Sequence, residues 1–216
     1  MHAPDLFGRD VFMAHRYADI AFTGPVKNVQ EVMGSRGAYA RRDSGPETNN
    51  RLGLIEADYI AARDGLYIAS VSDAGWPYVQ FRGGPPGFLR VLTDQELGFA
   101  DFRGNRQYIT TGNVAGNDRV SLFLMDYKNR RRLKIFGRMR ASQLSDNPKL
   151  AERLKVPGYP AIIERAFLIT VEAFDWNCPQ HITPRYTEAE IAHIFAGVRG
   201  KGSEDCGTAF SAALEE

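Results

Sequence analysis

The feature that most constrains this chain is a series of short β-forming runs, several of them joined by connections too short to hold a helix. Turn-forming segments such as DAGW (73–76) and TDQE (93–96) separate neighbouring runs. Connections of this length join antiparallel hairpins, whereas parallel strands need crossovers of about a dozen residues or more. The pattern therefore predicts a mainly β fold, a compact antiparallel barrel or sandwich. The expected strands are residues 66–72, 77–82, 87–92, 97–102, 119–127, 131–142 and 165–174.

Helical patterns flank these runs and divide the chain into parts. Apolar residues recur at helical spacing in 53–65, 147–154 and 188–195, and the residues before 51 combine short helical patterns with irregular, polar stretches. We find no internal repeat and no low-complexity segment. The expected parts are an N-terminal helical and irregular extension over 1–50, one barrel domain over 51–186, and a C-terminal helix and flexible tail over 187–216.

Composition argues against several classes of partner. The formal net charge is +1, so no overall field attracts nucleic acid or an anionic membrane. No apolar run reaches the roughly 18–20 residues of a membrane span, and the N-terminal residues lack the apolar core of a signal peptide. The two cysteines, Cys178 and Cys206, are too few for a disulfide framework. We therefore expect a cytoplasmic protein with reduced thiols and with neither nucleic acid nor a membrane as partner.

A first cluster of polar residues indicates an anion site. Asn105 is predicted to cap a short helix over 106–111, ending at Gly112. Arg103 and Arg106 then crowd the positive end of the helix dipole, where acidic residues are normally favoured. Free backbone N–H groups and two guanidiniums together favour a bound phosphate. The alternative is a pair of exposed arginines with no ligand.

A second cluster lies at the end of the strand 77–82. Alternation places Tyr78, Gln80 and Arg82 on one face of that strand, and Gly83 begins the glycine- and proline-rich segment GGPPG. Glycines at a strand end permit a ligand to approach the backbone closely, although a plain wide turn is the alternative. The segment is neither a dinucleotide-binding G-x-G-x-x-G motif nor a P-loop, because no helix and no motif lysine follow.

The basic run KNRRRLK (128–134), continued by Arg138 and Arg140, has three interpretations. Its arginines can be solvated or face a dimer partner, they can assist a bound cofactor, or they can bind single-stranded nucleic acid as small β-barrels do. Because the run straddles a predicted hairpin turn and the total charge is balanced, we favour the first interpretation.

The segment WNCPQHITPRY (176–186) carries the remaining reactive side chains. A metal site needs three or four suitable ligands, and Cys178 and His181 supply only two, so we predict no metal. A nucleophilic cysteine needs an activating partner, which Cys178 lacks apart from His181, and we expect Cys178 to be a packing residue. His181 is the candidate proton donor, because an imidazole titrates near neutral pH.

Three of these segments, VSDAGWPYVQFRGG, LGFADFRGNRQYI and NDRVSLFLMDY, resemble the pyridoxamine 5'-phosphate oxidase-like FMN-binding split barrels. The resemblance covers roughly residues 52–186. It implies a six-stranded antiparallel split β-barrel with flanking helices. It also implies a homodimer with one FMN in each of two clefts at the subunit interface.

The resemblance assigns roles to particular residues. Arg82 matches the arginine that contacts the FMN phosphate or ribityl chain, with Gly83 beside it. Asn105, Arg106 and Gln107 fall where the oxidases have a phosphate-binding Ser-Arg-Lys triplet, and Arg103 is the candidate replacement for the lost lysine. The segment 176–186 resembles the C-terminal wall of the flavin cleft in one subgroup, and its cofactor-contact candidates are Gln180, His181 and Arg185.

Two departures from the oxidases bear on activity. Ala100-Asp101 stands where the family has Tyr-Thr against the flavin, and the C-terminal substrate signature Arg-Leu-His-Asp-Arg is absent. We therefore expect an FMN-dependent oxidoreductase acting on a small organic substrate other than pyridoxamine phosphate. The alternatives are a reductase of the same fold that uses the deazaflavin F420, and a non-catalytic flavin-binding or flavin-sensing protein.

Overall fold

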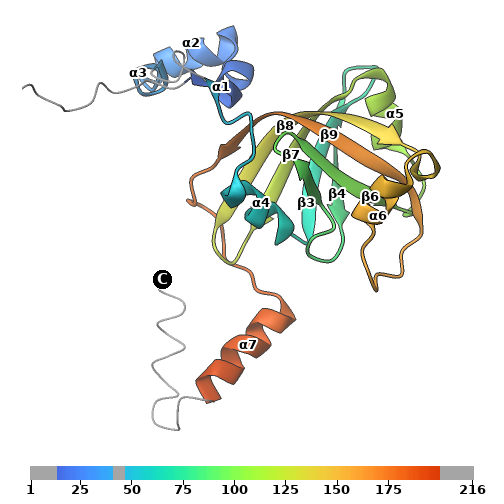
Figure 1. Ribbon diagram of the computed structural model, residues 1–216. Coiled ribbons are helices and arrows are strands. Elements are labelled where there is room, and N and C mark those ends of the chain that lie inside the picture. Colours follow the sequence, from blue (N-terminus) through green and yellow to red (C-terminus); the bar gives the residue numbers. More distant parts are fainter. Residues whose placement is uncertain (1–13, 41–46, 200–216) are drawn as a thin grey trace, which may run out of the picture. The chain divides into compact units, whose positions relative to one another are not determined.

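The computed structural model describes residues 14–40 and 47–199 (Figure 1). The predicted start of the N-terminal extension, the polar segment at 41–46, and the tail from residue 200 with Cys206 lie outside these ranges. The described residues form two compact units. The first contains 14–40, 47–126 and 131–179, and the second contains 127–130 and 180–199. The predicted domain boundaries at 50 and 186 stay predictions.

The first unit is built on one antiparallel sheet of seven strands, in the order β4-β3-β7-β8-β9-β6-β5. Each of the seven β-forming runs corresponds to one strand, so the mainly antiparallel β prediction is confirmed. The resemblance implied six strands in a barrel, and this count is wrong. The end strands β4 and β5 do not pair with each other, so the sheet is open. The strands are β3 (Gly65–Val71), β4 (Pro77–Gly83), β5 (Arg90–Thr93), β6 (Glu96–Phe102), β7 (Arg119–Asp126), β8 (Arg131–Ser142) and β9 (Ile163–Trp176).

Strand β9, the last of the chain, pairs with both β8 and β6 and so joins two halves of the sheet. Its register with β8 shifts at Phe136/Gly137, where a β-bulge bends the pair. A Cβ atom at Gly137 would lie 2.7 Å from Ile169 Cγ2 and 2.8 Å from the Thr170 carbonyl oxygen. Only glycine fits this close approach of two backbones.

The sheet curls around the core. The side chains that fill the core follow the period-two alternation of the strands. In β7, for example, Val120, Leu122 and Leu124 are buried while the residues between them are more exposed. A smaller cluster packs beneath α6 (Pro148–Leu154) and contains Leu150, Leu154 and Leu168. The side chains of the main cluster with no more than 1% exposure are Ile60, Leu66, Ile68, Phe88, Leu89, Leu97, Leu122, Leu124, Leu133, Ile135, Met139, Phe167 and Ile169.

Helix α4 (Leu54–Ala61) is fixed to the sheet by hydrogen bonds as well as by packing. The Tyr59 hydroxyl lies 3.0 Å from the Leu124 carbonyl oxygen, and Trp176 Nε1 donates to Glu56 Oε1 at 2.9 Å. Burial raises the pKa of Tyr59 to about 12, so the hydroxyl keeps its proton.

The other short elements of this unit are β1 (Ala14–His15), α1 (Arg16–Ala21), α2 (Gly24–Val32), α3 (Arg36–Ala40), β2 (Glu47–Thr48) and the 3-10 helix η1 (Leu144–Asp146).

Helix α5 spans Ile109–Gly116, between β6 and β7, and differs from the predicted helix over 106–111. Asn105 does not cap it, because its Oδ1 accepts instead from the Gln107 N–H at 3.1 Å and closes a local turn. Tyr108 occupies the cap position in a left-handed conformation (φ 54°). Gly112 lies inside the helix rather than at its end. Arg103 and Arg106 therefore precede the helix and do not belong to its first turn.

The second unit contains α7 (Glu188–Arg199), where the sequence predicted a C-terminal helix. Thr187 and Glu190 form a capping box at its start: the Glu190 N–H donates to Thr187 Oγ1 at 3.3 Å, and the Thr187 N–H donates to Glu190 Oε2 at 2.9 Å. The Arg185 guanidinium stacks 4.7 Å from the Tyr127 ring centroid. Within the described ranges, no helix has the length and apolar character needed to cross a membrane.

Candidate functional site

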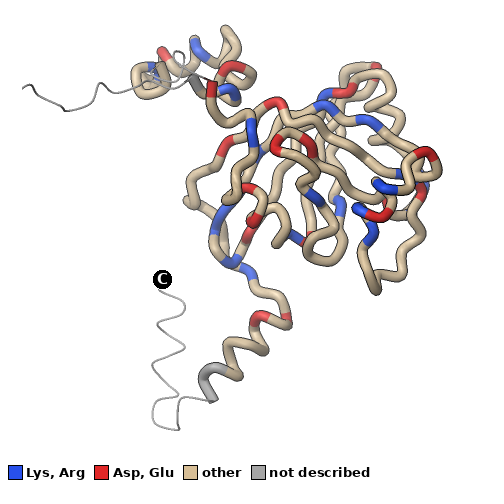
Figure 2. The backbone as a smooth tube through the Cα atoms, in the orientation of Figure 1, with Lys and Arg blue, Asp and Glu red and all other residues tan. Residues whose placement is uncertain are grey.

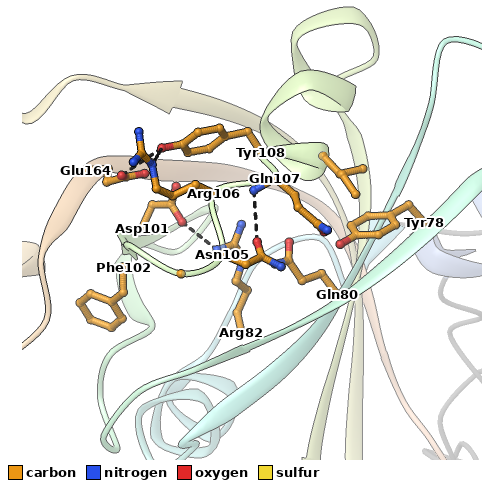
Figure 3. Close-up of a pocket in the computed structure, with 12 residues that line it drawn as sticks. Tyr78, Gln80, Arg82, Asp101, Phe102, Asn105, Arg106, Gln107, Tyr108 and Glu164 are labelled. Atoms are coloured by element: carbon orange, nitrogen blue, oxygen red, sulfur yellow. Dashed lines mark hydrogen bonds and ion pairs between the residues drawn. The ribbon is translucent and has the colours of Figure 1, made fainter.

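A polar cavity of about 200 Å³ lies where β4, β6 and β9 meet the segment that leads into α5 (Figure 3). Side chains from segments distant in the sequence line it, and most of them carry charge or hydrogen-bonding groups. The lining residues are Tyr78, Gln80, Arg82, Asp101, Phe102, Gly104, Asn105, Arg106, Gln107, Tyr108, Ile109 and Glu164.

Asp101 occupies the floor of this cavity between two arginines. Arg82 Nη1 lies 2.8 Å from Asp101 Oδ1, and Arg165 Nε lies 3.3 Å from Asp101 Oδ2. The Asp101 residue is only 3% exposed. Burial raises the pKa of the Asp101 carboxyl above its ordinary value, although the Arg82 and Arg165 guanidiniums act in the opposite direction. Arg82 is thus held in position by an ion pair with a buried carboxylate of β6, a strand that does not pair with β4.

Glu164 on β9 ties the segment before α5 to the sheet. Its Oε1 accepts from Arg103 Nε at 2.9 Å and from the Tyr108 hydroxyl at 3.1 Å, and its Oε2 accepts from Arg165 Nη2 at 3.2 Å. The hydrogen bond from Arg103 is the main cause of a lowered pKa for the Glu164 carboxyl. Arg106 Nε reaches the Tyr108 hydroxyl at 3.3 Å, so Arg106 lies beside Glu164 rather than beside Arg82 (Figure 3).

The backbone of this segment adopts uncommon conformations. Arg106 (φ 61°) and Tyr108 (φ 54°) both lie in the left-handed region, which bulky residues rarely adopt. Such residues cost about 1–3 kcal/mol each and cluster at ligand-binding sites, where the surrounding contacts hold them. Here the Asn105 turn and the Glu164 hydrogen bonds supply those contacts.

A second cavity of about 240 Å³ adjoins the first, and the two share Gln80, Arg82, Phe102 and Gly104. Its walls combine aromatic side chains with polar and charged groups. Apart from the shared residues it is lined by Phe81, Gly83, Phe88, Phe99, Ala100, Arg103 and Tyr159. The two cavities thus form one cleft with a polar part and an aromatic part.

The structure brings six of the residues predicted from the sequence into this cleft. The polar cavity includes Arg82, Asn105, Arg106 and Gln107, and the aromatic cavity adds Gly83 and Arg103.

The remaining predicted site residues, Gln180, His181 and Arg185, belong to the second compact unit, and their role stays a prediction. His181 is exposed and has a left-handed backbone (φ 61°). Cys178, in the first unit, is exposed, so its prediction as a packing residue is wrong. Because Pro179 follows it and no packed element covers it, the thiol does not enter the core.

Sequence reasoning missed several members of the site. The sequence predicts a strand over 165–174, with Glu164 directly before it, but it indicates no role for Glu164 or Arg165. It likewise indicates no role for Tyr108 or Tyr159. Tyr78 and Gln80 could have been predicted, because alternation puts them on the face of β4 that carries Arg82. For Glu164 no local signal exists, since its partners Arg103 and Tyr108 lie 61 and 56 residues away.

The basic run over 128–140 is largely paired with acidic side chains. Arg138 binds Asp118 and Glu172 at 2.9 and 2.8 Å, Arg140 Nη2 lies 3.2 Å from Glu96 Oε1, and Lys134 Nζ lies 3.3 Å from Asp175 Oδ2. Figure 2 shows basic and acidic residues interspersed along the strands of the first unit.

Among the residues that the structure describes, no group of three or more His, Cys, Asp or Glu side chains is arranged to hold a metal ion.

No protein-family model matches the chain. A search of curated proteins finds no match. Solved structures with some similarity include HupZ from Group A Streptococcus, which is 14% identical over 62% of this chain and 99% of that one, with a TM-score of 0.46.

Two other solved structures are similar at comparable levels. An FMN-binding protein from Syntrophomonas wolfei is 12% identical over 71% of this chain and 95% of that one, with a TM-score of 0.43. A protein from Clostridium acetobutylicum, related to general stress protein 26 and of the pyridoxinephosphate oxidase family, is 13% identical over 64% and 95%, with a TM-score of 0.42. All three TM-scores lie below 0.5, so the fold of this chain rests on its own strand order.

Proposed function

We propose that the chain is an FMN-binding oxidoreductase that acts on a small organic substrate. One observation carries this proposal: two separate basic elements, the end of β4 with Arg82 and the segment Asn105–Gln107, converge on a single polar cavity. These elements are distant in sequence, and they meet because the sheet brings the end of β4 close to β6, where Arg82 pairs with Asp101. Convergence of this kind suits a phosphate monoester.

The residues present fit the phosphate end of a flavin. The immediate surroundings contain two more guanidiniums than carboxylates, so the site favours an anion. Arg82 Nε is a buried donor with no hydrogen-bond partner among the described residues, and a ligand oxygen could satisfy it. The guanidiniums in this comparison are those of Arg82, Arg103, Arg106 and Arg165, and the carboxylates are those of Asp101 and Glu164.

The arginine and amide donors of the cavity indicate which functions belong to the cofactor and which belong to the protein. A bound flavin supplies hydride transfer at its N5 atom. The chain's own residues hold the phosphate with Arg82, Asn105 and Arg106. The turn at Asn105 fixes the segment that carries Asn105 and Arg106, and the ion pair with Asp101 positions Arg82. The described residues of the cleft contribute binding and orientation, and His181 stays the candidate proton donor.

We further propose a homodimer with its cofactor sites at the interface. The polar cavity, at about 200 Å³, is smaller than the roughly 300–1,000 Å³ of typical ligand sites, so a flavin whose phosphate it holds must extend beyond it. Strand β4 is an edge strand beside the cavity and exposes the apolar side chains of Val79 and Phe81. A second copy covering this edge would complete the site and bury an edge that otherwise favours aggregation.

The phosphate assignment can be tested by comparing FMN with riboflavin, which lacks only the phosphate. We expect the wild type to bind FMN more tightly than riboflavin. Arg106→Ala should weaken FMN binding by about 1.5–3 kcal/mol, the contribution of a charge-assisted hydrogen bond, and should leave riboflavin binding unchanged. Quenching of flavin fluorescence on titration measures both affinities. Arg140→Ala, which removes an exposed arginine paired with Glu96, is the matched control.

Three outcomes would redirect the proposal. Equal FMN affinity in Arg106→Ala and Arg140→Ala would remove the phosphate assignment. Binding of the deazaflavin F420 in preference to FMN, read from its bluer absorption, would identify the F420-dependent alternative. FMN binding without any bleaching by NADH or NADPH would favour a flavin-binding or flavin-sensing protein without turnover.

A further inference from the structure

We infer that the aromatic cavity is a separate subsite for a planar aromatic carboxylate, the ring-bearing part of the substrate. The inference rests on the flavin site proposed above only in naming this ligand a substrate. The cavity itself, its lining and its charge are properties of the described residues.

The size of the cavity and the aromatic side chains in its mixed lining favour a flat ring that carries a polar group. Phe88 and Phe99 form a buried apolar floor, and Phe102 and Tyr159 form a wall, with their ring centroids 5.0 Å apart at an interplanar angle of 60°. An apolar cavity of about 150 Å³ accommodates benzene. At about 240 Å³ the present cavity suits a one- or two-ring molecule, smaller than the three fused rings of a flavin.

The rim of the cavity carries a guanidinium able to bind a carboxylate. The Arg103 side chain is 47% exposed and uses its Nε for Glu164. Its two terminal nitrogens make no hydrogen bond to any residue that the structure describes, so they are available to a ligand. A planar guanidinium with two free donors matches a carboxylate in geometry and charge. The combination of aromatic walls and a rim arginine therefore selects an aromatic acid over a neutral hydrocarbon.

Two positions allow this subsite to be tested, one that belongs to it alone and one that it shares with the phosphate site. Tyr159 lines only the aromatic cavity, whereas Gly104 lines both cavities. A Cβ atom built at Gly104 meets no other atom within 4 Å, so a larger side chain there enters open space without displacing the protein. By contrast, a Cβ atom at Gly84 would lie 2.8 Å from Phe88. Gly104 is therefore the position at which the cleft can be narrowed with the fold kept intact.

The test uses 2-naphthoate as the probe and isothermal titration calorimetry on the full chain. We expect 2-naphthoate to bind the wild type, and Tyr159→Ala and Gly104→Val each to weaken it at least about fivefold, through lost ring contacts or lost volume. Arg103→Met should remove the preference for 2-naphthoate over the neutral 2-naphthol. Trp76→Ala, which removes an exposed aromatic side chain of the first unit that lines neither cavity, should change nothing. Thermal melting confirms that each variant is folded.

Parallel FMN titrations separate this inference from the proposed function. We expect Tyr159→Ala to leave FMN affinity unchanged, and FMN and 2-naphthoate to bind together. No binding of 2-naphthoate, or equal binding in the wild type and Tyr159→Ala, overturns the inference while the flavin proposal stands. Displacement of 2-naphthoate by FMN also overturns it, because the aromatic cavity would then belong to the flavin. Binding of 2-naphthoate without any FMN binding would sustain the aromatic subsite and remove the proposed function.

Discussion

Asp101 shows how a single carboxyl group in the cleft is subject to opposing influences. Two guanidiniums favour its charged form, while the loss of water around a group that is 3% exposed disfavours it. Burial is the larger effect, and it raises the pKa of Asp101. In the family that the sequence resembles, a threonine stands at this place, so this chain has an ionisable group where a neutral one is expected.

This raised pKa predicts the pH dependence of stability. Because the folded-state pKa lies above the ordinary value of 3.8, the stability linked to protonated Asp101 is fully present below that value. It is lost as the pH rises through the raised pKa. We therefore expect the free energy of unfolding of the wild type, relative to Asp101→Asn, to fall as the pH rises from 3.8 towards neutrality. Urea unfolding at constant ionic strength measures the difference, and a difference that grows with pH would contradict the assignment.

Gly137 is a second residue whose identity is dictated by its surroundings, in this case by two backbones in close contact. Gly137→Ala places a methyl group against the Thr170 carbonyl oxygen, which cannot move without disturbing the β8–β9 pair. We expect a loss of about 1–3 kcal/mol in the free energy of unfolding, as for other overpacked positions. Chemical denaturation measures this loss. Gly112→Ala in α5 is the control: its Cβ meets no atom within 4 Å, and it should stabilise by about 0.5–1 kcal/mol. Similar effects of the two substitutions would refute the argument.

At the scale of the elements, the strands could be predicted from the sequence and the start of α5 could not. Strand β7 alternates buried and exposed residues over its whole length, and this pattern depends only on the local sequence. The helix start depended on how Asn105 uses its side chain, since the same carbonyl can cap a helix or close a turn. In this chain the turn forms, and the Tyr108 hydroxyl that follows it donates a hydrogen bond to Glu164 on the distant strand β9.

The residues of the cleft divide in the same way, into those that the local sequence marks and those that it does not. Arg82 and Asn105–Gln107 could be found because strand alternation and a basic, turn-forming segment mark them locally. Glu164 and Arg165 could not, because their role arises only when β9 pairs with β6. The strand count shows a related limit: the residues themselves predicted seven strands, and the resemblance to a family implied six.

At the scale of the whole molecule, the exposed edge strand predicts association. Val79 on β4 is 60% exposed and lies between Tyr78 and Gln80, which face the polar cavity from the other side of the strand. We expect the wild type to sediment as a dimer and Val79→Lys to sediment as a monomer, because a lysine on this edge would be desolvated by a partner. Sedimentation velocity at several concentrations measures both. Ile55→Lys, on the exposed face of α4, should stay dimeric. A wild type that is monomeric at every concentration would exclude the dimer.

The position of β9 has a consequence for how the chain is made on the ribosome. Strands β3, β4, β7 and β8 can pair among themselves as they are synthesised, and so can β5 and β6. The two groups have no strand in common until residues 163–176 emerge and insert between β8 and β6. Because long-range pairing is slow, nascent chains should spend this interval with two unpaired strand edges, of β8 and β6, open to chaperones. The polar cavity, around which Glu164 and Arg165 of β9 gather their partners, is therefore among the last parts of the first unit to form.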